Sequence, residues 1–167
     1  TVAAIARVAP DTWFLLVGDG PLREQLRADA AQRGFGDRLV MVGRVPPNTV
    51  PEYIQAMGVV VHMSLREGIA RVLPQAGAVG KPVVTFDLDG APEVIRNGIS
   101  GYLVPALDTD QVADLLRCSN NVALRKECRH QIRGTFNRGG SKLGRHSRHY
   151  RAPYTPSPYS AATVQEK

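Results

Sequence analysis

Cysteine, aromatic residues and long apolar runs are scarce in this sequence. It has two cysteines in 167 residues, Cys118 and Cys128, and a helix through both would hold them about 15 Å apart, too far for a disulfide. Aromatic residues make up 6% of the chain, and no apolar run approaches the roughly 20 residues that span a membrane. No signal peptide is visible. We therefore expect a cytoplasmic protein with reduced thiols.

The sequence also lacks two common chemical signatures. No cluster of His, Cys and Asp has the spacing of a metal site, although Asp87-Leu88-Asp89 matches the letters of a metal-binding Asp-x-Asp. No G-x-G-x-x-G follows the first strand-like run, which disfavours a dinucleotide-dependent oxidoreductase. The chain begins with Thr1 and not Met, and we expect its true N-terminus to be missing.

Charge is unevenly distributed along the chain. Residues 1–124 contain 11 Lys and Arg against 13 Asp and Glu, whereas residues 125–167 contain 10 against 2. After about residue 134 the chain is rich in Gly, Ser, Pro and basic residues and has almost no aliphatic ones. Such a segment buries too little apolar surface to offset its ordering entropy. We predict a globular domain at 1–134 and a disordered basic tail at 135–167.

Within residues 1–134, short apolar runs alternate with helical patterns. This alternation predicts an α/β fold with a parallel sheet flanked by helices, and ligands in such sheets bind beyond the carboxyl ends of the strands. The expected strands are Trp13–Val17, Leu39–Gly43, Gly58–Met63, Pro82–Phe86 and Tyr102–Val104. The expected helices include Val2–Val8, one from Leu22 that Gly34 closes, Val50–Ala56 capped by Asn48, one with Pro74 in its first turn that stops at Gly80, and one that Asp108 opens.

The most informative stretch runs from Ser64 to Ile95. Glu67 and Gly68 follow an apolar strand, and Gln75 comes eight positions after Glu67 in a helix of small residues. A second buried strand then leads into a loop that turns at Gly90 and presents Glu93 beside a new helix start. A carboxylate before a helix, the amides at the helix start and an acceptor inside its first turns favour a nucleotide-sugar site.

The string EGIARVLPQAGAVGKPVV resembles the C-terminal, donor-binding half of retaining group 1 (family 4) glycosyltransferases. Those enzymes usually have E-G-x-P-R-V-x-x-E-A-x-A-x-G-x-P-V-V. The matching residues are Glu67, Gly68, Arg71, Val72, Ala76, Ala78, Gly80, Pro82, Val83 and Val84. The resemblance extends from about Val2 to Leu116. It implies a Rossmann-like domain of the GT-B fold and the transfer of a sugar, with retention, from a nucleoside diphosphate sugar to an acceptor.

The resemblance also implies roles for individual residues. Glu67 would contact hydroxyls of the donor sugar and is the catalytic candidate. The donor-binding candidates are Gly18, Asp19, Gly20, Arg66, Gly68, Ile69, Arg71, Gln75, Gly90 and Glu93. Gln75 stands where the family has a second Glu that binds the ribose diol, and it offers one acceptor oxygen and an NH₂ donor in place of a carboxylate.

The resemblance implies no metal and no tightly bound cofactor. Catalysis in the family depends on holding the donor and stabilising the departing diphosphate with amides and cations. The family's acceptor-binding N-terminal half and a loop with Arg and Lys would precede Thr1, so we expect this chain alone to bind nucleotide weakly and to transfer little. Peripheral association with the inner face of the membrane is compatible with the basic tail, whereas nucleic-acid binding is disfavoured.

Several residues keep alternative interpretations. Glu67 could cap the following helix or pair with Arg66 or Arg71, and Glu93 could serve only the helix dipole. His62, inside an apolar strand, is more typical of a satisfied core or strand-end residue than of a base. Arg44 could face diphosphate or pair at the surface. Gln75 in place of Glu supports a second hypothesis, in which the chain is a non-catalytic nucleotide-binding or interaction module of the same fold.

Overall fold

The structure, a computed structural model, describes residues 1–119 and 161–165. The strands are β1 (Trp13–Val17), β2 (Leu39–Gly43), β3 (Met57–His62), β4 (Val83–Phe86), β5 (Gly101–Val104) and β6 (Ala161–Gln165). The helices are α1 (Val2–Val8), α2 (Arg23–Gln32), the short 3₁₀ helix η1 (Gly36–Arg38), α3 (Val50–Ala56), α4 (Val72–Ala78), α5 (Ala91–Val94) and α6 (Thr109–Ser119). The predicted boundary near residue 134 lies outside the described residues.

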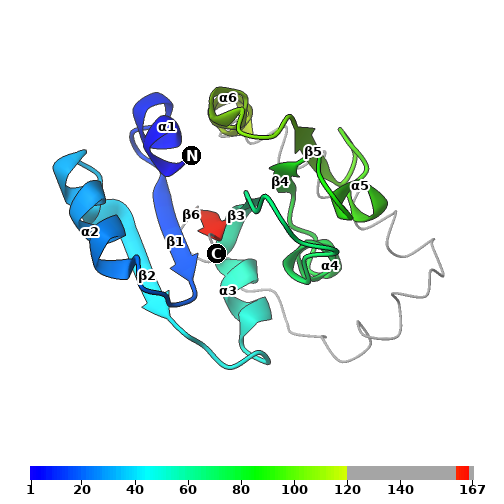
Figure 1. Cartoon of the computed structure of the whole chain (residues 1–167), viewed down its shortest axis with the longest axis horizontal. Helices are drawn as coiled ribbons and strands as arrows, with labels where there is room; N and C mark the ends of the chain where they lie inside the picture. The colour runs from blue at the N-terminus through cyan, green and yellow to red at the C-terminus, as the bar shows by residue number, and fades with distance from the viewer. Residues whose placement is uncertain (120–160, 166–167) are drawn as a thin grey trace.

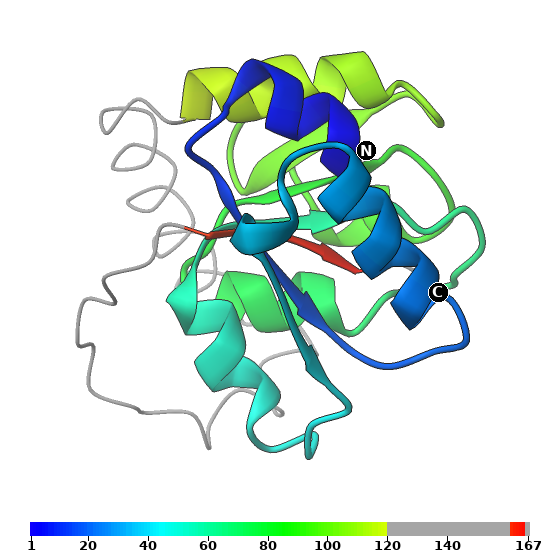
Figure 2. The ribbon, with the colours of Figure 1, turned by 90° about the vertical axis from the view of Figure 1, so that its left-hand side faces the viewer.

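All six strands belong to one parallel sheet in the order β2-β1-β6-β3-β4-β5, with helices on both faces (Figures 1 and 2). The predicted Rossmann-like arrangement is therefore confirmed. No helix among the described residues is long and apolar enough to cross a membrane.

The core lies in two layers, one on each face of the sheet. Val59 and Val61 of β3 pack into a cluster with Ile5 of α1 and Leu116 of α6, whereas Val60, between them, packs into a second cluster with helices α3, α4 and α5. Alternate residues of β3 thus enter opposite layers, because successive side chains of a strand point to opposite faces. This double burial explains why β3 and β4 are nearly continuous apolar runs.

Helix ends follow the expected residue chemistry in most places. Gly34 after α2 and Gly80 after α4 have φ of 75° and 70°, the left-handed conformation that ends many helices. Pro74 lies in the first turn of α4, where a missing N–H costs little. The prediction that Asn48 caps α3 is wrong. The residue before α3 is Thr49, which makes no side-chain cap, and its hydroxyl donates to the carbonyl of Pro46 at 2.8 Å.

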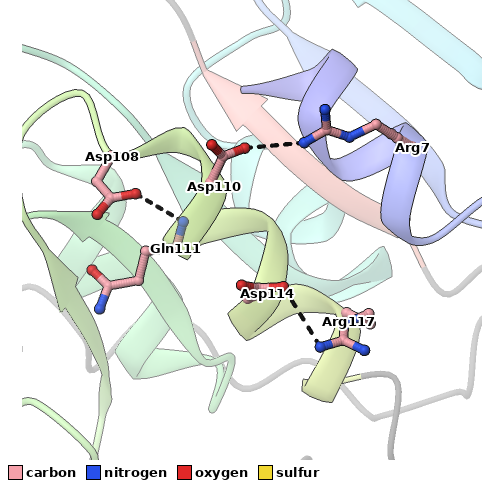
Figure 3. A network of polar contacts seen from close by, with 6 residues as sticks. All are labelled: Arg7, Asp108, Asp110, Gln111, Asp114 and Arg117. Atoms are coloured by element: carbon pink, nitrogen blue, oxygen red, sulfur yellow. Dashed lines mark hydrogen bonds and ion pairs between the residues drawn. The ribbon is translucent and has the colours of Figure 1, made fainter.

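Helices α1 and α6 lie side by side on one face of the sheet (Figure 2). Asp108 precedes α6, and its Oδ1 accepts a hydrogen bond from the backbone N–H of Gln111 at 2.9 Å, which confirms that Asp108 opens this helix (Figure 3). Arg7 of α1 donates to Asp110 of α6 at 3.1 Å, and both side chains are more than 70% exposed. Solvent screens this ion pair, so apolar packing holds α1 on α6.

The prediction of no packed structure from residue 135 to residue 167 is wrong for Ala161–Gln165. These five residues form β6, which lies between β1 and β3 in the middle of the sheet. The prediction considered only apolar side chains, whereas β6 pairs its backbone on both edges. The rest of the predicted tail, residues 135–160 and 166–167, lies outside the described residues.

Candidate functional site

Three loops with candidate residues leave the same edge of the sheet. Because β1, β3 and β4 all run parallel, the loops at Gly18–Pro21, Ser64–Arg71 and Asp87–Gly90 follow carboxyl ends of strands. This is the edge at which open α/β sheets bind ligands. The candidate residues therefore share one rim, as their positions in the sequence predicted.

Glu67 is held by two residues from neighbouring strand ends. Its Oε2 lies 3.4 Å from Nε2 of His62, the last residue of β3, and the two side chains are 19% and 8% exposed. Its backbone N–H donates to Oδ2 of Asp89, in the loop after β4, at 3.0 Å. The carboxylate is thus fixed near the rim by its side chain and by its backbone together.

A backbone contact joins the loops after β3 and β4. The N–H of Gly90 donates to the carbonyl of Gly68 at 2.9 Å. A Cβ at position 90 would lie 2.5 Å from that carbonyl oxygen and 2.6 Å from Cγ1 of Ile69, so only glycine permits this approach. The turn itself depends on Asp89, which has a φ of 49°. Gly90 therefore serves the close approach, and Asp89 supplies the left-handed residue.

Helix α4 follows the first of these loops and carries Gln75. The N–H of Leu73 donates to the carbonyl of Ala70 at 3.1 Å, and Pro74 has no N–H. These two positions of the first turn therefore offer no N–H donor to a ligand. The helix start supplies fewer donors than the sequence led us to expect. The half-buried Gln75 is the fourth residue of α4, and its N–H donates to the carbonyl of Arg71 at 3.2 Å.

The glycine loop after β1 has its own supports. Gly18 has a φ of 146° and donates to the carbonyl of Gly43, at the end of β2, at 3.0 Å. Oδ1 of Asp19 accepts from the N–H of Gly20 at 3.0 Å and lies 3.7 Å from Arg23. Nothing lies within 4 Å of a Cβ built at Gly18 or Gly20, so the backbone of this loop is open on that side. The hydrogen bond from Gly18 to Gly43 links this loop to the end of β2.

The remaining candidates are exposed at the rim. Arg66 lies beside Glu67, and Arg71 immediately precedes α4. Ile69 is 48% exposed although it is aliphatic, and Glu93 is exposed in the short helix α5. Two arginines, an exposed apolar residue and open glycine backbone thus lie in the same loop as Glu67, at the carboxyl edge of the sheet. A polyanion with a hydroxyl-rich group matches this combination of charges and acceptors.

The structure adds His62 and Asp89 to the candidate site. The sequence analysis treated His62 as a core or strand-end residue and Asp89 as part of a turn, and both descriptions are correct but incomplete. The Asp-Gly pair after a buried strand was the available signal, because Asp tolerates positive φ and its carboxylate often accepts backbone N–H groups. Within residues 1–119 and 161–165, no group of three or more His, Cys, Asp or Glu could hold a metal ion.

Comparison with known proteins identifies the family. The family model described as "Glycosyl transferases group 1" matches residues 1–133. The Vi polysaccharide biosynthesis protein VipC/TviE of Salmonella typhi is 37% identical over 106 residues, which are 64% of this chain and 18% of that protein. Across the eight curated relatives compared, the chain spans between 18% and 34% of the relative's length.

Solved structures agree with this match. HepE of Anabaena in complex with UDP is 25% identical, with a TM-score of 0.71 over 80% of this chain and 38% of that protein. The C-terminal domain of LpcC, a group 1 family protein of Francisella tularensis, shares the fold with a TM-score of 0.71 at 24% identity. That match covers 81% of this chain and 74% of the LpcC domain.

Proposed function

Because the chain belongs to the group 1 glycosyltransferases and has the fold of one domain of their GT-B structures, we propose that it is the nucleotide-sugar-binding domain of a retaining enzyme of this class. The observation that carries the proposal is the pair of joined loops at the carboxyl edge, in which His62 and Asp89 hold Glu67. A neighbour of the same fold is in complex with UDP, which supports a nucleoside diphosphate sugar as the donor.

Each part of the donor has matching residues on the rim. Glu67 would accept hydrogen bonds from hydroxyls of the sugar, and Gln75 would bind the ribose. The backbone at Gly18, Gly20 and Gly68 admits the diphosphate closely, since nothing lies within 4 Å of a Cβ at these positions. Arg66 and Arg71 supply positive charge for the diphosphate. The same proposal gives Asp19, Ile69, Gly90 and Glu93 supporting positions around the donor.

The proposed chemistry uses the rim to stabilise a leaving group. Negative charge grows on the diphosphate as the glycosidic bond to it breaks, and fixed guanidinium groups stabilise that charge. Retention of configuration at the anomeric carbon requires the acceptor to attack from the same face of the sugar that the diphosphate leaves. We place the acceptor-binding residues outside this chain, which spans 38% of HepE, and we expect no transfer by the chain alone. No protein nucleophile is proposed.

The supports of Glu67 determine how it would work. Asp89 fixes the backbone of Glu67, and His62 fixes its carboxylate, so the acceptor oxygens are positioned before the sugar arrives. Neither His62 nor Asp89 needs to touch the donor for this effect. They are positioning residues in this proposal, whereas Glu67 touches the sugar.

The test separates binding of the sugar from binding of the nucleotide. Calorimetric titration compares UDP and UDP-glucose against the native chain, Glu67→Gln and the exposed control Glu52→Gln on α3. Glu67→Gln should weaken the binding of UDP-glucose by about tenfold, which corresponds to one charge-assisted hydrogen bond to the sugar. Its affinity for UDP should stay within about twofold of that of the native chain. Equal losses for both ligands would show that Glu67 supports the fold and does not bind the sugar.

Gln75 also supports a second candidate function. A carboxylate accepts from both hydroxyls of a ribose diol, whereas the amide of Gln75 has one acceptor oxygen. A non-catalytic nucleotide-binding module of the same fold tolerates this weakening. Such a module would bind UDP and UDP-glucose with equal affinity, so the same titration distinguishes the two functions.

The setting of the proposed enzyme follows from its substrates. Nucleoside diphosphate sugars are cytoplasmic metabolites, and we propose a cytoplasmic enzyme. A related Mycolicibacterium smegmatis protein is named as a mannosyltransferase that acts on a phosphatidylinositol monomannoside. A lipid acceptor of that kind would bring the enzyme to the inner face of the membrane. The Salmonella relative is named for polysaccharide biosynthesis, the process we propose for this chain.

A further inference from the structure

Arg23 connects helix α2, strand β2 and the glycine loop after β1. It is the first residue of α2, and its Nη2 donates to the carbonyl of Met41 in β2 at 2.9 Å. Its Nη1 lies 3.7 Å from Oδ1 of Asp19 in the glycine loop. One guanidinium group therefore contacts both the neighbouring strand and the loop that leads into its own helix.

The ends of β1 and β2 are shaped for this contact. Their register shifts between Leu16 and Val17, and beyond the shift the N–H of Gly18 donates to the carbonyl of Gly43 at 3.0 Å. Gly43 has a φ of 76°, and a Cβ built there would lie 3.2 Å from Nη1 of Arg23. Glycine at this position thus lets the guanidinium group lie close against the end of β2. Irregular strand ends of this kind are common beside active sites.

The two glycine N–H groups of the loop have partners within the protein. Gly18 donates to Gly43, and Gly20 donates to Oδ1 of Asp19 at 3.0 Å. What the loop offers a ligand is therefore its open shape, since nothing lies within 4 Å of a Cβ built at Gly18 or Gly20. Glycine restricts the backbone less than other residues do, so this shape depends on contacts made by the loop's neighbours.

Arg23 is suited to supply such a contact. Its side chain is 27% exposed, whereas that of Arg27, one turn further along α2, is 59% exposed. Solvent therefore screens the charge of Arg23 less, and its planar guanidinium group makes hydrogen bonds in fixed directions. Because the hydrogen bond to Met41 anchors this group on β2, its attraction for Asp19 holds the loop against the sheet.

We propose that Arg23 is a positioning residue for the nucleoside diphosphate part of the donor. It keeps the glycine loop open through Met41 on one side and Asp19 on the other. This role rests on the proposed function, and it makes Asp19 a support of the loop and not a contact of the donor. The supports of Glu67 lie elsewhere, at the ends of β3 and β4. The rim thus has two halves that are positioned separately, one for the nucleotide and one for the sugar.

The test compares UDP and UDP-glucose by calorimetric titration of the same variants. Arg23→Gln should weaken the binding of UDP by about fivefold or more, because it removes the charge-assisted hydrogen bond and the ion pair that hold the loop. The ratio of the affinities for UDP-glucose and UDP should stay within about twofold of the native ratio, since Glu67 keeps its supports. The matched control Arg27→Gln, which breaks an exposed pair with Glu24 on the same helix, should leave both affinities within about twofold.

Two further variants separate positioning from folding. Lysine has one ammonium group in place of the planar fork, so the affinity of Arg23→Lys for UDP should lie between those of the native chain and Arg23→Gln. Asp19→Asn should weaken UDP by about twofold to threefold, and it should have no further effect in the Arg23→Gln chain. Each titration is made at a temperature at which circular dichroism shows the variant to be folded. Arg23→Lys and Asp19→Asn keep the test decisive should Arg23→Gln not fold.

Three results would overturn the role of Arg23. One is binding of UDP by Arg23→Gln, Arg23→Lys and Asp19→Asn with the native affinity. Another is an equal loss in Arg27→Gln. The third is a fall in the ratio of the two affinities as large as the fall in the affinity for UDP, which would show a general effect on the fold of the rim. A native chain that binds no UDP would overturn both this role and the proposed function, whereas native binding that Arg23→Gln leaves unchanged would overturn this role alone.

Discussion

Gly90→Ala tests the joined loops on which the candidate site depends. The added Cβ would lie 2.5 Å from the carbonyl oxygen of Gly68 and 2.6 Å from Ile69, far inside ordinary contact distance. The nearest atom belongs to the backbone, so a change of rotamer does not remove the clash. Forcing a methyl group into a filled space typically costs about 1–3 kcal/mol. For a chain of this size that cost lowers Tm by about 2–12 °C.

The assay is thermal unfolding followed by circular dichroism, with Gly68→Ala as the matched control. A Cβ at Gly68 has nothing within 4 Å, so this variant should melt at the native temperature or slightly above it. Trimming Ile69 to Ala in the Gly90→Ala protein should not restore stability, because the backbone clash remains. Equal melting of Gly90→Ala and Gly68→Ala would refute the contact between the two loops.

Two further predictions concern the nucleotide and α6. Gln75→Glu should tighten binding of UDP by up to about tenfold, with a smaller gain for 2′-deoxy-UDP, and calorimetry that gives equal gains would exclude contact with the ribose. Asp108→Ala should lower the free energy of unfolding by about 1 kcal/mol, because it removes the acceptor for the N–H of Gln111. Arg7→Ala, which breaks only an exposed ion pair, should lower the free energy of unfolding by less than about 0.5 kcal/mol (Figure 3). Urea titration measures both variants, and a larger loss for Arg7→Ala than for Asp108→Ala would contradict this account.

Local sequence signals were sufficient for most of the fold. The bounds of β1, β2 and α3 were predicted as the structure has them, because each is a short periodic or apolar segment with turn residues on both sides. Gly34 and Gly80 marked helix ends for the same local reason. The cap of α3 was missed, because the turn from Pro46 to Thr49 moves the helix start one residue beyond Asn48.

Contacts between distant residues were beyond the sequence. Glu67 and Asp89 are 22 positions apart, and their hydrogen bond exists only because β3 and β4 are adjacent in the sheet. The sequence offered Arg66 and Arg71 as partners of Glu67, since they are near in the chain, whereas the structure places its carboxylate beside His62. Strand β6 was missed because an interior strand can be stabilised by backbone pairing without an apolar pattern.

The central claim is that a nucleoside diphosphate sugar binds at the carboxyl edge of the sheet. The most direct measurement is a titration of the ¹⁵N-labelled chain with UDP-glucose, followed by backbone amide shifts in NMR spectra. The account predicts that the largest shifts occur at the rim, at Gly18, Gly20, Gly68, Gln75 and Gly90. Amides at the opposite edge, at Trp13, Met57 and Gly101, should remain unchanged. Saturable binding that shifts the opposite edge, or no binding at millimolar UDP-glucose, would contradict the account.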